Sequence, residues 1–161
     1  MANTVTVGIA DLNVVKSPDT LITYALGSCV GICLYDDAAK VAGLAHIMLP
    51  LSTEAKQSAG GNMRRYADTG IAELIQKMGA KGANTARLTA KIAGGAQMFS
   101  VNSAVFNIGE RNVAAVKKVL SSYRIRIVAE ETGSNYGRTQ LFHADTGIME
   151  IRAATKQTKM Y

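Results

Sequence analysis

The chain has 161 residues, of which 48% are hydrophobic and 19% charged, a balance typical of packed globular proteins and not of disordered ones. We expect residues 1–161 to form a single domain, because a chain of this length can bury a core of its own. The formal net charge is +6, yet the basic residues are scattered, without a long basic run or interleaved aromatics. The composition therefore favours acidic partners and argues against nucleic acid.

No stretch is apolar over the roughly 18 residues needed to cross a bilayer. The opening residues, MANTVTVGIADLN, have neither a basic start nor a continuous apolar core, so they do not resemble a secretory signal. The sequence therefore predicts a cytoplasmic protein without membrane insertion. In that compartment Cys29 and Cys33 are expected to remain thiols.

The predicted elements begin with strands. Apolar residues alternate with small or polar ones over 5–9, which indicates a first strand, and an extended stretch leads into a second at 29–36. The short polar segment 36–40 is suited to a hairpin turn. The apolar stretch 41–49 is then the partner strand, and it ends at a proline.

The second half mixes helices with strands. Apolar residues at helical spacing predict a helix over 63–78, with Asn62 as its cap, and another over 110–122. The expected strands of this half are 85–93, 124–131, 139–144 and 148–153. Many short strands with two helices predict the α/β (α+β) class, in the form of β-sheets packed in layers with helices.

Cys29 directly follows Gly27 and Ser28, and it could be part of a disulfide, a metal ligand, a buried apolar residue or a nucleophile. In an extended segment its α-carbon lies about 13 Å from that of Cys33, beyond the roughly 7 Å that a disulfide spans. Two cysteines and two histidines, without metal-ligand spacing, do not make a structural metal site, so we expect no metal. A buried apolar cysteine, the commoner case, and a nucleophile both remain open.

Strand pairing offers this cysteine a partner. If Asp37 and Ala38 form a two-residue turn, Cys29 lies directly opposite His46, and opposed β-carbons about 4.5–5.5 Å apart let the thiol meet the imidazole. A histidine so placed lowers the thiol pKa and yields a nucleophilic thiolate. Gly31, diagonal to the imidazole in this register, leaves room for it and for a substrate.

Three neighbouring residues are candidates for supporting roles. Backbone N–H groups around Gly27 and Ser28 could stabilise an oxyanion, since glycine lets a ligand approach the backbone closely. The hydroxyls of Thr23 and Ser28 are candidates for orienting His46 or the substrate. Cys33, in the strand interior, is expected in the core.

The motifs of the chain resemble those of the CheD family, the chemoreceptor glutamine deamidases. The stretches that carry the resemblance are, in order, GIADLNVV, LGSCVGICLYD, GLAHIMLP, RRYADTGI, AKIAGGAQMF, IGERNV and ETGSNYGRT. The resemblance implies that Cys29 is the nucleophile, that His46 is the general base and acid, and that Thr23 is the third functional residue. It also implies a layered fold similar to the catalytic domains of deamidating bacterial toxins.

The function implied by the resemblance is hydrolysis of specific glutamine side-chain amides of methyl-accepting chemotaxis receptors to glutamate and ammonia. The reaction runs through a thioester on the cysteine and needs no cofactor. The implied partners are these receptors and the phosphatase CheC, with loop 94–99 as a candidate contact. The alternative is a non-catalytic module that binds CheC and stimulates its phosphatase activity. At Tyr24 and Ala25 the chain departs from the smaller residues common in the family.

Overall fold

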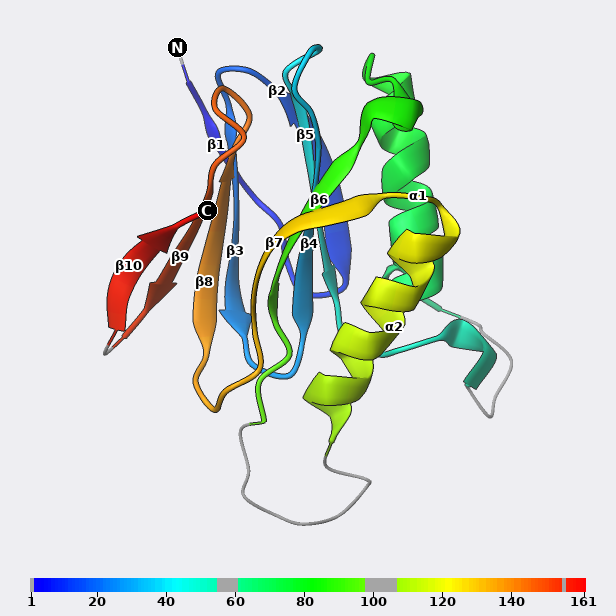
Figure 1. Cartoon of the computed structure of the whole chain (residues 1–161), viewed down its shortest axis with the longest axis vertical. Coiled ribbons are helices and arrows are strands. Elements are labelled where there is room, and N and C mark those ends of the chain that lie inside the picture. The colour runs from blue at the N-terminus through cyan, green and yellow to red at the C-terminus, as the bar shows by residue number, and fades with distance from the viewer. Residues whose placement is uncertain (1, 55–60, 98–106, 155) are drawn as a thin grey trace.

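The computed structural model describes residues 2–54, 61–97, 107–154 and 156–161. Within these ranges the strands form two five-stranded sheets that pack face to face. Two α-helices cover the outer face of the second sheet, so the layers run sheet, sheet, helices (Figure 1). The expected class, a layered α+β arrangement, is confirmed.

The first sheet has the strand order β1-β3-β8-β9-β10. Its strands are β1 Thr4–Thr6, β3 Thr20–Leu26, β8 Arg138–His143, β9 Met149–Ala153 and β10 Lys156–Met160. β1 runs parallel to β3, and the other pairs are antiparallel. The sequence did not predict β10, because the stretch is polar and every residue in it is exposed, which leaves no alternation to detect.

The second sheet has the order β2-β5-β4-β6-β7 and lies in the middle of the molecule (Figure 1). Its strands are β2 Asp11–Lys16, β4 Val30–Asp36, β5 Val41–Ile47, β6 Thr89–Gly94 and β7 Arg126–Thr132. Only β6 and β7 are parallel. All residues of β4 and β5 are buried, because the first sheet covers one face and the helices the other.

The helices differ from the predicted ranges mainly at their ends. The α-helices are α1 Ala67–Ala80 and α2 Ile108–Ser122, and the short 3-10 turns are η1 Ser52–Glu54, η2 Met63–Arg65 and η3 Thr85–Arg87. Asn62 does cap a helical turn, but its side chain accepts from the Arg64 amide of η2 and not from α1. The apolar face of α1 packs on the second sheet through Ile71, Leu74 and Met78.

The turn between β4 and β5 has four residues, 37–40, and not the two expected. The Asp36 carboxylate accepts hydrogen bonds from the amides of Ala38 and Ala39, at 3.0 and 3.2 Å, which stabilises the longer turn. Lys40 closes it with a φ of 54°. The local polar sequence allows either length, and the carboxylate acceptor decides between them.

The longer turn moves the pairing of β4 with β5 by two residues. Gly31, and not Cys29, lies directly opposite His46, so the expected Cys29–His46 pair is wrong in register. Because the shift is even, His46 still faces the first sheet. Cys29 lies just before the first residue of β4.

Gly94 shows how tightly the second sheet surrounds the Cys29 backbone. Its φ is +108°, and an added β-carbon would lie 2.2 Å from the Cys29 carbonyl oxygen. We expect Gly94→Ala to lower the free energy of unfolding by about 2–4 kcal/mol, measured by urea denaturation. The added β-carbon would meet backbone atoms of Cys29 and Val30, which cannot turn away as a flexible side chain can. Gly8→Ala is the control, since nothing lies within 4 Å of its added β-carbon. Equal unfolding midpoints for the two variants would contradict this account.

Candidate functional site

His46 lies fully buried between the two sheets. Its Nδ1 is 2.7 Å from Thr23 Oγ1, and that hydroxyl donates to the Val7 carbonyl, also at 2.7 Å. A threonine hydroxyl has one proton, and that of Thr23 is donated to the Val7 carbonyl. The Thr23 oxygen can therefore only accept from His46, so the imidazole proton is on Nδ1. Nε2 is therefore a lone-pair acceptor, and no group in the described part of the chain bonds to it.

Burial keeps this pair of candidate groups uncharged. It lowers the pKa of His46 from 6.5 to about 4, and it raises the pKa of the Cys29 thiol above its usual value. The expectation that the histidine lowers the thiol pKa is therefore wrong for the resting protein. The site rests as a thiol and a neutral imidazole, and not as a thiolate–imidazolium ion pair.

The segment after β6 holds the backbone on both sides of Ser28. The Ala96 amide donates to the Gly27 carbonyl and the Gly95 amide to the Cys29 carbonyl, both at 2.8 Å. Cys29 itself is half-buried and packs against the apolar layer between the sheets. These bonds fix the backbone position from which the Cys29 side chain extends.

Asn112 of α2 completes this support. It is fully buried, and its Nδ2 donates to the Ser28 and Met48 carbonyls, both at 2.9 Å. One side chain thus ties the loop before β4 to the segment after β5, the strand of His46. Sequence reasoning missed it, although its helical spacing to Val116 marks a polar residue on the buried face.

A β-bulge in β3 precedes the cysteine loop, residues 27–29 between β3 and β4. The pairing of β3 with β8 shifts between Thr23 and Leu26, and Ala25 within the bulge has a φ of 61°. The bulge leaves Tyr24 53% exposed. The Gly27 amide donates to the Ala25 carbonyl at 3.0 Å, so one of the expected oxyanion donors is already engaged.

The predicted site residues come together to different degrees. Thr23 and His46 are directly hydrogen-bonded, and their sheets meet there. Gly27, Ser28 and Cys29 follow one another in the connection between β3 and β4. Cys33 is fully buried in the core between the sheets, as expected.

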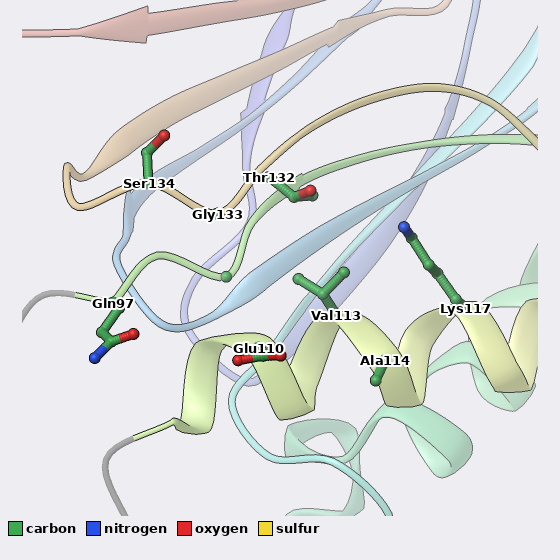
Figure 2. Close-up of a pocket in the computed structure, with 9 residues that line it drawn as sticks. Gln97, Glu110, Val113, Ala114, Lys117, Thr132, Gly133 and Ser134 are labelled. Atoms are coloured by element: carbon green, nitrogen blue, oxygen red, sulfur yellow. The ribbon is translucent and has the colours of Figure 1, made fainter. Parts of the chain in front are cut away.

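A cavity of about 430 Å³ opens beside the cysteine loop. Figure 2 shows it between α2 and the loops that follow β6 and β7, with the Glu110 and Lys117 side chains on the helix side. Its lining contains none of the predicted site residues, but Gly95 belongs both to its wall and to the bond with the Cys29 carbonyl. Of loop 94–99, residues 98 and 99 lie outside the described residues.

Two further observations limit what the described residues can do. Within them, no three His, Cys, Asp or Glu side chains group closely enough to hold a metal ion. None of their helices has the length and apolar character required to cross a membrane.

This chain is similar in sequence to a known family and to several known proteins. The family model described as CheD chemotactic sensory transduction matches residues 48–153. A probable chemoreceptor glutamine deamidase CheD of Caldanaerobacter subterraneus subsp. tengcongensis is 57% identical over 148 residues, which cover 91% of this chain and 90% of the relative. The chemoreceptor glutamine deamidase CheD of Halalkalibacterium halodurans is 50% identical over 161 residues, 99% of each chain.

A third relative, a probable chemoreceptor glutamine deamidase CheD of Lachnoclostridium phytofermentans, is 48% identical over 161 residues, again 99% of each chain. The matches place this chain in a class of chemotactic sensory-transduction proteins. Within that class, the chain belongs to the CheD family.

The pKa of His46 predicts how stability depends on pH. The folded protein binds this proton only near pH 4 but the unfolded chain near 6.5, so stability is full above pH 6.5 and is lost as the pH falls toward 4. Between those values we expect wild type to lose about 3 kcal/mol more than His46→Asn, whose amide can still donate to Thr23. Urea denaturation at a series of pH values measures the difference. Parallel curves for the two proteins would refute the assignment of a buried neutral imidazole.

Proposed function

We propose that residues 1–161 form a single CheD-like glutamine deamidase domain that hydrolyses specific glutamine side-chain amides of methyl-accepting chemotaxis receptors in the cytoplasm. The relatives named as chemoreceptor glutamine deamidases support the substrate class. The observation that carries the proposed chemistry is the bond between Thr23 and His46, which leaves Nε2 as a base. The net charge of +6 suits an acidic partner surface.

In the first half of the proposed reaction, His46 Nε2 takes the proton of the Cys29 thiol while the sulfur attacks the amide carbon. Burial disfavours both the thiolate and the imidazolium, so the proton moves with the attack and not before it. Thr23 keeps Nδ1–H engaged throughout, and its hydrogen bond strengthens when the ring becomes charged.

The second half begins with a tetrahedral oxyanion. Because the Gly27 amide already donates to Ala25, the amides of Ser28 and Cys29 are the proposed oxyanion donors. Nε2–H then protonates the amide nitrogen, the C–N bond breaks, ammonia leaves, and a thioester remains. Water that loses a proton to Nε2 attacks the thioester, which releases glutamate and restores the thiol. Every group that takes part in these reaction steps belongs to the chain, the substrate or water.

The proposal predicts that activity depends on one of the two cysteines. Cys29→Ala should reduce deamidation of cognate receptor fragments at least about 1,000-fold, because the nucleophile is lost. Mass spectrometry measures this as a gain of about one dalton at each glutamine converted. Cys33→Ala is the matched control and should stay active, since Cys33 lies in the core. Equal conversion of receptor glutamines by wild type and Cys29→Ala would contradict the proposal.

We also propose, from the family resemblance, that the chain binds CheC where that phosphatase is present. Binding that is separate from catalysis predicts that Cys29→Ala stimulates CheC as well as wild type does. The phosphatase rate, titrated with each protein, measures this. Failure of wild type to change the rate would exclude the interaction, and failure of Cys29→Ala alone would make it dependent on the thiol.

A further inference from the structure

A third side chain shares the layer in which Thr23 and His46 meet. Gln140 of β8 is fully buried and lies directly opposite Thr23 in the first sheet. On the facing sheet, Gly31 lies directly opposite His46. Two cross-strand pairs, one from each sheet, therefore meet inside an otherwise apolar core.

The Gln140 carboxamide takes the space that Gly31 leaves. Its Nε2 donates to the Gly31 carbonyl at 3.2 Å and lies 3.2 Å from Met149 Sδ. Its Oε1 lies 1.7 Å from where a β-carbon on Gly31 would be. Opposed β-carbons of an antiparallel pair are about 4.5–5.5 Å apart, so Oε1 lies roughly 3–7 Å from the His46 β-carbon. It is not hydrogen-bonded to the neutral ring. The room expected beside the imidazole is thus occupied by a polar group.

Gln140 Oε1 and His46 Nε2 share an unusual property. Both, like Asn112 Oδ1 of α2, are buried acceptors for which the described part of the chain supplies no donor. An unpartnered acceptor in a core is costly and needs a physical explanation, of which a catalytic role is one. In the proposed reaction Nε2 gains a proton and becomes a donor inside this layer.

We propose that Gln140 is a positioning residue for His46, holding the imidazole against Thr23 and accepting a hydrogen bond from Nε2 while the ring is protonated. This inference rests on the deamidase function proposed above. The protons balance over the cycle. In the first half the proton of the Cys29 thiol passes to Nε2, beside Oε1, and then to the amide nitrogen, which leaves as ammonia. In the second half Nε2 takes a proton from water and returns it to the Cys29 sulfur as the thioester is hydrolysed.

Few other ionisable groups face His46 from the surrounding strands. Cys29 and Cys33 are thiols whose pKa values burial raises. The charged groups of the neighbouring strands include two ion pairs, Asp11 with Arg64 on the β2 side and Arg138 with Glu131 on the β8 side. Lys91 of β6 is also charged, and its ammonium donates to the Gly147 and Tyr161 carbonyls. A substitution at Gln140 is therefore the most direct way to change the electrostatic environment of the ring.

Two substitutions separate the polar role of Gln140 from its volume. Gln140→Met keeps the length of the side chain, and we expect kcat to fall about 10- to 100-fold, the effect of one hydrogen bond to a charged group, with little change in KM. Gln140→Glu restores an oxygen acceptor, so its kcat should exceed that of Gln140→Met. Its negative charge should also raise the titration midpoint of His46 and move the acid limb of the pH–rate profile upward.

The titration is measured by NMR of the histidine rings, with His143, the only other histidine, as an internal reference. Met149→Leu is the control, because it removes the contact of Gln140 Nε2 with sulfur and keeps Gln140 and an apolar side chain of similar size. Circular dichroism and thermal unfolding establish that each variant is folded. If Gln140→Glu does not fold, the kcat and KM values of Gln140→Met decide.

Several results would overturn the role of Gln140. These are an equal loss of kcat in Met149→Leu, a higher KM at unchanged kcat in Gln140→Met, or an unmoved His46 midpoint in folded Gln140→Glu. Wild type that does not deamidate cognate receptors would instead overturn the proposed function. The His46 titration would still decide whether Gln140 acts on the ring.

Discussion

The hydrogen bond from His46 Nδ1 to Thr23 Oγ1 joins the two sheets, and the proposed chemistry depends on it. In serine-protease triads a carboxylate fixes the histidine tautomer and stabilises the charged ring. Here a neutral hydroxyl, committed to the Val7 carbonyl, fixes the same tautomer without adding charge. The low pKa of His46 follows, because burial is not offset by a nearby anion. A resting site without charges can therefore lie in an apolar layer at little electrostatic cost.

That layer also explains why the supporting groups are polar but neutral. Gln140 and Asn112 are both fully buried. Asn112 Nδ2 donates to the Ser28 and Met48 carbonyls, and Gln140 Nε2 donates to the Gly31 carbonyl and contacts Met149 Sδ. Neutral amides can hold a backbone in place without the desolvation penalty of a buried ion. The buried charges of the fold are instead paired: Asp36 with Arg87, whose guanidinium reaches solvent, and Glu131 with Arg138, where both side chains are buried.

Local patterns predicted the parts of the fold that depend on neighbours in sequence. Alternation located β4 and β5, and helical spacing located α1 and α2 within a few residues. The predicted pairing of Cys29 with His46 was wrong in register, but a two-residue shift leaves His46 on the same face of the sheet that this pairing implied. The supporting contacts could not be predicted in this way, since Asn112 and Ser28 are 84 positions apart. A polar residue on an apolar face was the available signal, both at Asn112 and at Gln140.

The order of these residues along the chain has a consequence for biosynthesis. Thr23, Cys29 and His46 all lie in the first third of the protein, whereas the groups that hold the cysteine loop and fill the space beside the imidazole lie in the second half. A nascent chain exposes the thiol and the imidazole long before the ribosome has made α2 and β8. The geometry of the site therefore arises only on completion of the chain, and a truncated product has its reactive residues without their arrangement.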